Sequence, residues 1–242
     1  MTVPLYLNSN ELVCTATITK AVNNVIVLNQ TVFYPKGGGQ PSDVGVIRLP
    51  GTELKVEKVL KNTKEGTKDI EHYVVGDFST ATPGTEVTCC VDSDTRHLHS
   101  RYHLAGHLIR IAFITLGISH EWKTGVTSHL PGAAYVEFNQ RSGNQEVIDI
   151  SSIEQECVWL IDKKLKSWTV DNVKMDDIPE KAKWMVRCED CNSLRIHRVE
   201  GIDDYWMPCG GTLCDNLGEI GKFKITKHSF KKGLLRICYQ LD

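Results

Sequence analysis

Short apolar runs rich in β-branched residues, separated by turn residues, fill the N-terminal part of the chain. Residues 12–35 form the longest run, and Asn23 and Asn24 mark a hairpin turn inside it. Further apolar runs follow at short spacing at residues 43–49, 54–60, 72–78 and 85–92. Short strands joined by Gly, Pro and Asn predict a small barrel or sandwich, and we place it at residues 1–90.

In the second part of the chain, hydrophobic positions recur at helical spacing. Residues 92–117 predict a long helix, and residues 151–168 predict a second one that begins with Ser151 and Glu154 as a capping box. Strands are predicted between and after these helices at residues 132–140, 184–188, 194–202, 220–227 and 233–241. Residues 91–242 are therefore predicted to form an α+β domain.

Composition narrows the class of protein. Hydrophobic residues make up 41% of the chain and charged residues 24%, as in a soluble globular protein. A net charge of -2 gives no general attraction to nucleic acid or to an anionic membrane, so any contact with RNA has to be local. No apolar run approaches the ~18 residues of a membrane helix, and the N-terminus has no secretion signal. Nine cysteines in such a chain indicate reduced thiols, and we expect a cytoplasmic protein without membrane or DNA partners.

Three histidines stand four residues apart on the first predicted helix: His99, His103 and His107. Each step of four residues rotates the helix by about 40°, so the three side chains share one strip. His103 and His107 form an H-x-x-x-H pair, in which imidazoles on adjacent turns suit one zinc ion. Taken alone, such a pair is more often a chance feature of a solvated face, and His99 is expected to be a neighbour rather than a ligand.

The stretch WMPCGGTLCDN at residues 206–216 supplies sulfur. Cys209 precedes two glycines, which let the backbone approach a site closely. Thiolate sulfur binds zinc, so His103, His107 and Cys209 together form a set of ligands typical of catalytic zinc, with an open position for water. Water bound in this way is activated to attack an ester carbonyl.

The cysteines are compatible with two other chemistries. Cys188 and Cys191 form a C-x-x-C, and with Cys209 and Cys214 they make a zinc ribbon the main competing metal site. Buried reduced thiols remain the simpler interpretation of the C-x-x-C itself. Cys209 is alternatively a nucleophile that uses a histidine of the helix as its base. We rank this second alternative below the metal, because two histidines on one strip suit chelation better than a proton relay.

A glycine-rich loop, TVFYPKGGGQPSDVG, occupies residues 31–45. Three consecutive glycines stand there between two prolines: Gly37, Gly38 and Gly39. Their backbone N–H groups can form a nest for a phosphate or carboxylate. The amide of Gln40 and the hydroxyl of Thr31 offer further polar groups to a substrate. A wide turn in the barrel explains the same glycines without any ligand.

Three motifs in one order along the chain resemble the AlaX family, the free-standing editing proteins related to the editing domain of alanyl-tRNA synthetase. The motifs are TVFYPKGGGQPSDVG, RYHLAGHL and CGGTLCDNLGEIGKFKI. The resemblance covers residues 10–240 and is to the medium type of the family. It implies a small N-terminal β-barrel followed by an α+β editing domain of the threonyl/alanyl-tRNA synthetase type.

The resemblance also implies an activity. It implies a zinc-dependent aminoacyl-tRNA hydrolase that acts in trans and without ATP on mischarged tRNA(Ala), with Ser-tRNA(Ala) and also Gly-tRNA(Ala) as substrates. Such an enzyme binds the acceptor end of tRNA and serves translation fidelity. The glycine-rich motif is associated with serine, which implies substrate-binding roles for Gly37, Gly38, Gly39, Gln40 and Thr31. A pocket that bonds the substrate hydroxyl rejects an alanyl group, because its polar partner would go unpaired. The catalytic residues expected on this basis are Thr31, Gln40, His103 and His107.

The metal motif departs from the family at one position. The resemblance implies H-x-x-x-H plus C-x-x-x-H, and His103, His107 and Cys209 match three ligands, whereas Leu213 stands at the fourth. Three arrangements stay open: three ligands completed by water, Cys214 as the fourth ligand, or no metal. We favour one zinc ion in a weakened site over complete loss. The alternative is a catalytically impaired relative that binds tRNA or has a regulatory role.

Local contacts with RNA are predicted from basic and aromatic side chains. Five lysines cluster near the C-terminus: Lys222, Lys224, Lys227, Lys231 and Lys232. Three arginines lie on the first helix: Arg96, Arg101 and Arg110. These cations can meet phosphates, although a solvated surface explains any single one of them. Bases of a single-stranded CCA end are predicted to stack on Phe33, Tyr34 or Trp206, which are equally candidates for the core.

Overall fold

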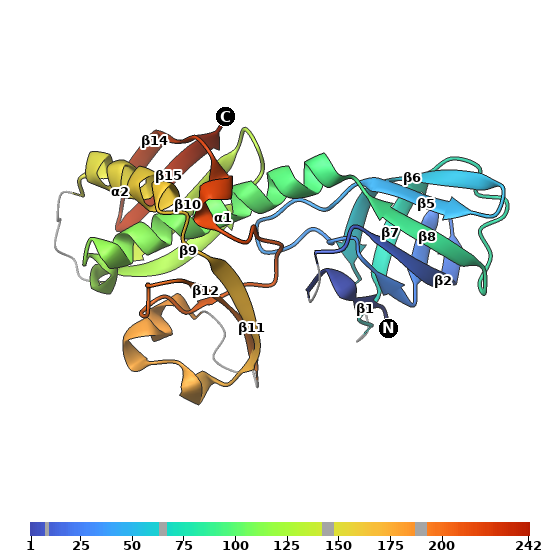
Figure 1. Cartoon of the computed structure of the whole chain (residues 1–242), viewed down its shortest axis with the longest axis horizontal. Helices are drawn as coiled ribbons and strands as arrows, with labels where there is room; N and C mark the ends of the chain where they lie inside the picture. Colours follow the sequence, from blue (N-terminus) through green and yellow to red (C-terminus); the bar gives the residue numbers. More distant parts are fainter. Residues whose placement is uncertain (8–9, 63–66, 142–147, 187–192) are drawn as a thin grey trace. The chain divides into compact units, whose positions relative to one another are not determined.

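The computed structural model describes residues 1–7, 10–62, 67–141, 148–186 and 193–242 (Figure 1). The described residues form two compact units, Met1–His99 and Ser100–Asp242. The division falls within the helix α1 (Ser93–Thr115), whereas the sequence places the boundary just before that helix. Helices occur together with antiparallel sheets and a closed barrel, so the α+β fold predicted from the sequence is confirmed.

Six strands of the first unit close into a barrel in the order β2-β3-β7-β6-β5-β8. These strands are β2 (Val13–Val22), β3 (Val25–Leu28), β5 (Gly45–Leu49), β6 (Thr52–Lys61), β7 (Ile70–Val75) and β8 (Glu86–Val91). Two short strands pair in parallel: β1 (Val3–Pro4), which begins the unit, and β4 (Gln30–Thr31), which follows β3. The 3-10 helix η1 (Leu5–Leu7) lies between β1 and β2. Asn23 and Asn24 have left-handed φ angles of 50° and 60°, so the predicted hairpin turn is confirmed.

Alternate residues of the strands form the core of the barrel. In β6, Leu54 and Val56 point inward, and a bulge after Val56 moves the next inward position to Val59. Gly45 begins β5 at the end of the glycine-rich motif, and a Cβ there would lie 2.2 Å from the carbonyl oxygen of Cys90. The barrel therefore closes between β5 and β8 only with glycine at this position.

The main sheet of the second unit is antiparallel, with the strand order β14-β15-β10-β9. Its strands are β9 (Trp122–Ser128), β10 (Ala134–Gln140), β14 (Phe223–Lys231) and β15 (Leu234–Leu241). The helices α1 and α2 (Ile150–Asp162) lie beside this sheet (Figure 1) and share one hydrophobic core with it. In this core, the ring centroids of Phe113 and Phe138 stack at 4.1 Å. Since most of α1 beyond Tyr102 is buried, its polar side chains there are enclosed. Within the described ranges, no helix has the length and apolarity needed to cross a membrane.

A smaller sheet of the second unit has the strand order β11-β12-β13. Its strands are β11 (Ser167–Val173), β12 (Leu194–Val199) and β13 (Met207–Pro208). Short 3-10 helices connect the elements of this unit: η3 (Ser119–Glu121), η4 (Met175–Asp177), η5 (Glu180–Met185) and η6 (Leu217–Ile220). Cys209 directly follows β13, so this sheet sets the position of its thiol.

The second predicted helix differs from α2 at both ends. Asp149 caps α2 by accepting the N–H of Ser151 at 3.0 Å. The predicted capping box of Ser151 and Glu154 is therefore wrong, because an acceptor two residues earlier takes that N–H group. The helix also ends earlier than predicted, since Lys164 adopts a left-handed φ of 50° and the chain then enters β11.

The strand predicted at residues 184–188 is wrong where the structure describes it. Trp184 and Met185 belong to η5, which follows Pro179, whose φ is -54°. Residues 187 and 188 lie outside the described residues. The sequence also did not predict β11, because its buried positions lie almost only at its two ends and the chain shows no alternation between them.

Candidate metal centre

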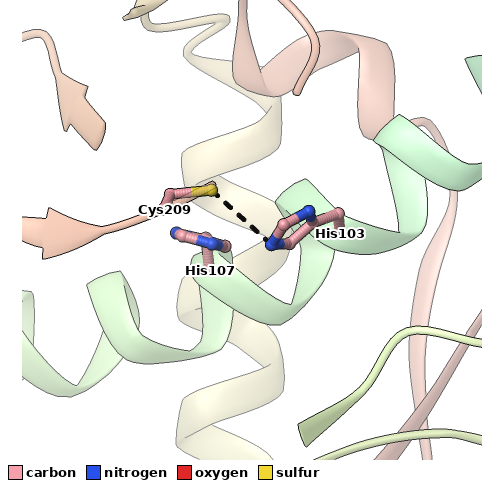
Figure 2. A group of neighbouring side chains, drawn as sticks. All are labelled: His103, His107 and Cys209. Carbon is pink, nitrogen blue, oxygen red and sulfur yellow. Dashed lines mark hydrogen bonds between the residues drawn. The ribbon is translucent and has the colours of Figure 1, made fainter. Parts of the chain in front are cut away.

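Two histidines of α1 and one cysteine from the loop after β13 meet inside the second unit. His103, His107 and Cys209 each offer one ligand atom, and these atoms lie within 4.8 Å of one another. All three side chains are buried. Figure 2 shows both histidines on α1 with Cys209 beside them, and Nε2 of His103 lies 3.7 Å from Sγ of Cys209. The structure thus brings together three ligands that the sequence predicts.

Backbone and side-chain contacts hold the cysteine loop against this part of α1. The N–H of Cys209 donates to the carbonyl of Arg195 at 2.9 Å, which continues the pairing of β12 and β13. The Arg195 guanidinium in turn donates to the carbonyls of Cys209 at 2.9 Å and Gly211 at 3.0 Å. Farther along, the hydroxyls of Thr212 and Ser100 lie 2.7 Å apart. The thiol is therefore positioned by contacts on both sides of the loop.

Among the residues that the structure describes, this group does not include Cys214, the fourth predicted ligand. Its thiol packs in the hydrophobic core of the second unit, where burial raises its pKa to about 12. Leu213 packs against the same core. The Cys214 sulfur also lies within 4.8 Å of a carboxylate oxygen of Glu219, so its neighbours differ from those of Cys209. The group described here therefore consists of two imidazoles and one thiol. Cys188 and Cys191, which the zinc ribbon requires, lie outside the described residues.

Two further buried histidines surround the group, and sequence reasoning missed both. The ring of His129, after β9, stacks on that of His103 at 4.6 Å between centroids. The ring of His197, on β12, lies 4.8 Å from that of His107. The available signal for His197 is its place in a predicted strand, next to the apolar Ile196. His129 offers no such signal, because it lies in a loop.

Gly106 makes room for one of these rings. A Cβ at this position would lie 2.2 Å from Cε1 of His129 and 2.9 Å from the hydroxyl of Tyr239. His129 Nδ1 lies 2.7 Å from that same hydroxyl, which donates to the carbonyl of Tyr102 at 2.8 Å. The Tyr239 oxygen therefore accepts the proton of His129 Nδ1. The glycine in the RYHLAGHL motif thus has a packing role.

Burial keeps the histidines of the site neutral. It lowers the pKa of His103 to about 3, and the charges of Arg110 and Arg195 act in the same direction. Burial likewise places the pKa of His107 well below its usual range. It raises the pKa of the Cys209 thiol, whereas a backbone hydrogen bond from Gly211 and the two arginines lower it. Neutral imidazole nitrogen is the form that binds a metal, and a coordinated thiol loses its proton outright.

The donor set fits zinc better than a hard cation. Two imidazole nitrogens and one sulfur are ligands that zinc prefers, whereas magnesium and calcium prefer oxygen. His103, His107 and Cys209 are the residues that would hold the ion, and all three lie close together in the folded chain.

Comparison with known proteins relates this chain to aminoacyl-tRNA synthetases. The model for tRNA synthetases class II (A) matches residues 5–95, and the model for the threonyl and alanyl tRNA synthetase second additional domain matches residues 194–237. The alanine–tRNA ligase of Archaeoglobus fulgidus is 32% identical over 218 residues, which cover 87% of this chain and 22% of the ligase. This chain belongs to the alanyl-tRNA synthetase-related editing family. Cys209 lies inside the second matched segment.

Other ligases of this group match in the same way. The alanine–tRNA ligase of Korarchaeum cryptofilum is 30% identical over 235 residues, covering 89% of this chain and 23% of the ligase. That of Pyrococcus abyssi is 28% identical over 240 residues, covering 93% of this chain and 24% of the ligase. The chain of this editing-family protein therefore spans less than a quarter of the length of the curated relatives it matches.

The remaining predicted site residues lie in the barrel unit of this family member. Thr31 is fully buried, and its hydroxyl lies 2.8 Å from Nε2 of His72. Nδ1 of His72 donates to the carbonyl of Ile26 at 3.1 Å, so Nε2 accepts the hydroxyl proton of Thr31. The hydroxyl oxygen also accepts the N–H of Phe33 at 3.1 Å. The Thr31 hydroxyl is therefore engaged within the barrel.

The glycine loop of the family motif is a closed turn. Gly37 and Gln40 exchange two backbone hydrogen bonds, of 3.2 and 2.9 Å. Between them, Gly38 and Gly39 are exposed and have left-handed φ angles of 55° and 82°, which glycine adopts without strain. The side chain of Gln40 is buried. The turn itself uses the N–H groups of Gly37 and Gln40. The N–H groups left for a ligand are therefore those of Gly38 and Gly39 at its tip.

Four of the residues predicted to contact RNA are buried, so these predictions are wrong. They are two arginines of α1 and two aromatic residues of the barrel unit. Arg96 is buried and paired with Asp43, and buried Arg110 donates to the carbonyl of Gly106 at 2.8 Å. Phe33 and Tyr34 belong to the core of the barrel. In contrast, the five C-terminal lysines are all exposed: Lys222 lies just before β14, and the other four lie on β14 or in its turn to β15.

Proposed function

We propose that this chain hydrolyses the ester bond of mischarged tRNA(Ala), with Ser-tRNA(Ala) as the leading substrate and Gly-tRNA(Ala) as a second. The observation that carries the proposal is the buried group of His103, His107 and Cys209 in a chain of the alanyl-tRNA synthetase-related editing family. The reaction runs in trans, without ATP, on the acceptor end of a cytoplasmic tRNA. It makes the chain an aminoacyl-tRNA hydrolase of translation fidelity.

His103, His107 and Cys209 would hold one zinc ion. When bound, zinc supplies a Lewis acid that activates water for attack on an ester carbonyl. The residues of the chain prepare the site for it: burial keeps both imidazoles neutral, so their nitrogen lone pairs are available. The nearby charges of Arg110 and Arg195 favour the thiolate form of Cys209, against its burial.

Preference for a seryl group rests on the barrel motif. We propose that Thr31, Gln40 and the glycine loop form the amino-acid pocket. Thr31 is fully buried, so a seryl group would reach the remaining lone pair of its hydroxyl oxygen only when the pocket opens on binding. Because His72 and Phe33 fix that oxygen, it cannot turn away to suit an alanyl group. Thr31→Val is expected to lower the ratio of seryl to alanyl hydrolysis. Thr19→Val, which changes an exposed threonine of β2, is the matched control.

The tRNA backbone is proposed to meet the exposed lysines of β14 and the following turn. Each phosphate contact contributes to the salt dependence of binding, with a slope of roughly 0.7–0.9 per contact. Lys224→Ala combined with Lys227→Ala should therefore reduce the salt dependence of tRNA binding by about two phosphate contacts. An unchanged slope would show that tRNA binds to another part of the molecule.

The deciding experiment measures serine release from Ser-tRNA(Ala) by the zinc-loaded protein. Wild type and His228→Ala, which changes an exposed histidine on β14, should hydrolyse the ester, whereas His103→Ala should not. Chelator-treated wild type should lose activity and regain it with zinc. No hydrolysis above the buffer rate under any zinc condition would contradict the proposal.

The second candidate function is that of a catalytically impaired relative, which binds tRNA or has a regulatory role. It is favoured by the position of Leu213, which packs against the core where the family motif has a ligand. This candidate predicts tRNA binding without turnover in the wild type and in Leu213→His. Hydrolysis that depends on His103 would exclude it.

A further inference from the structure

A chain of buried side chains leads from His107 into the small sheet. Nδ1 of His107 is hydrogen-bonded to the hydroxyl of Tyr205 and lies 3.0 Å from Nδ1 of His197. The Tyr205 hydroxyl lies 3.2 Å from the same nitrogen of His197. On the far side of that ring, Nε2 of His197 lies 2.7 Å from the hydroxyl of Ser167. All four side chains are buried, so these contacts exclude bulk water.

Two opposite arrangements of protons satisfy the hydrogen bonds of this chain, and they differ in which nitrogen of His107 carries the proton. In the first, His107 Nδ1–H donates to the Tyr205 oxygen, and Tyr205 O–H donates to Nδ1 of His197. His197 Nε2–H then donates to the oxygen of Ser167. A neutral imidazole carries a single N–H, so His107 keeps a lone pair on Nε2.

The opposite arrangement places the proton of His107 on Nε2. Among the described residues, Nε2 of His107 makes no hydrogen bond, and the thiol of Cys209 in the same group is only a weak acceptor. The oxygen of Tyr205 is a stronger acceptor, and a buried N–H without a good acceptor is costly. The first arrangement is therefore the more stable one.

The sheet register explains why these residues meet. His197 is paired with Thr169 on β11 and with Met207 on β13. Ser167 begins β11, and Tyr205 lies in the connection between β12 and β13. The same sheet therefore carries Cys209 at the end of β13 and the side chains that reach the outer nitrogen of His107.

We propose that Tyr205 and His197 are positioning residues that hold His107 in the Nδ1–H form, with Nε2 turned toward the metal. The proposal rests on the metal-dependent function proposed above. Metal-binding histidines donate their other N–H to an acceptor that fixes ring orientation and raises ligand basicity. Here a tyrosine, a histidine and a serine serve together as that acceptor.

The test uses Tyr205→Phe, which keeps the ring and removes the hydroxyl, and His197→Gln, which keeps a polar side chain. His228→Ala is the matched control, because it removes an exposed histidine from the same unit. Zinc affinity is measured by competition with a chromogenic chelator. Loss of an outer partner of this kind weakens metal binding by about 10–100-fold, and we expect that range for both variants, with no change in the control.

A second readout does not depend on bound metal. Imidazole ¹⁵N NMR of the zinc-free wild type should show His107 with its proton on Nδ1, and Tyr205→Phe should shift the ring toward a mixture of both forms. His107 with its proton on Nε2 in the wild type overturns the proposal, and so does unchanged zinc affinity in both variants. Failure of the wild type to bind zinc instead overturns the metal-dependent function, while the NMR spectrum still decides the position of the proton.

Discussion

At the scale of single residues, the clearest constraint is the contact between Gly106 and His129. A glycine inside a helix normally costs about 1 kcal/mol relative to alanine, so its presence in α1 needs a reason. The reason is the His129 ring, which occupies the space that a Cβ would need. The ring in turn stacks on His103, so packing at the glycine reaches a proposed ligand.

Gly106→Ala is expected to lower the free energy of unfolding by about 1–3 kcal/mol, the usual cost of overpacking. The measurement is urea unfolding of the zinc-free protein. Gly210→Ala is the control, because a Cβ at Gly210 meets nothing within 4 Å, and its effect should stay within about 0.5 kcal/mol. A Gly106→Ala protein as stable as wild type would show that the ring moves aside at no cost.

His72 predicts a pH dependence for the barrel unit. Burial lowers its pKa to about 4 from 6.5, so the unfolded chain binds a proton between these values and the folded chain does not. Stability from this group is therefore complete above about pH 6.5 and is lost as the pH falls toward 4. The loss is roughly 3 kcal/mol, at about 1.36 kcal/mol per pH unit.

We expect the free energy of unfolding of His72→Gln to fall less steeply than that of wild type over this window. The measurement compares the two proteins by circular dichroism at several pH values. The comparison is needed because the buried histidines of the second unit add their own acid dependence to both proteins. His97→Gln, which changes an exposed histidine, should keep the wild-type slope, and equal slopes in all three would contradict the assignment.

At the scale of elements, the start of α2 is capped by a different residue from the one that the sequence pattern predicts. Ser151 and Glu154 have the spacing of a capping box, yet Asp149 provides the cap. Glu154 instead accepts the backbone N–H of Ile225 at 3.2 Å, so it joins the helix to β14. Local spacing alone does not show that a side chain is claimed by a strand far away in the sequence.

Asp149→Ala should therefore destabilise the protein by about 1 kcal/mol, the usual cost of losing an N-cap. Ser151→Ala should change the free energy of unfolding by less than about 0.5 kcal/mol, as for a surface substitution. Thermal unfolding of both variants decides between the two caps. The reverse order of effects would restore the capping box.

At the scale of the whole molecule, zinc should stabilise one unit selectively. All five tryptophans of the chain lie in the second unit, beginning with Trp122, so their fluorescence reports on the unit that holds the metal ligands. A ligand that binds only the folded state adds about 4 kcal/mol at a free concentration 1,000 times its Kd. The fluorescence transition should therefore move to higher temperature with zinc.

The control for this prediction is His103→Ala, whose fluorescence transition should no longer respond to zinc. Far-UV circular dichroism also reports on the barrel, which holds none of the proposed ligands. The unfolding transition of the barrel should therefore keep its midpoint when zinc is added. An equal response in wild type and His103→Ala would place zinc binding elsewhere in the chain.

The sequence by itself determined features that depend on backbone geometry between near neighbours. The hairpin at Asn23 and Asn24 follows from left-handed turn residues, and the strip shared by His103 and His107 follows from helical periodicity. The α+β class follows in the same way from runs of alternating and helical spacing. Only the tertiary structure brought His129, His197 and Tyr205 to these histidines, took Cys214 into the core, and joined Thr31 to His72. These contacts join residues far apart in the chain, so they are decided by how strands and helices pack, which no local spacing records.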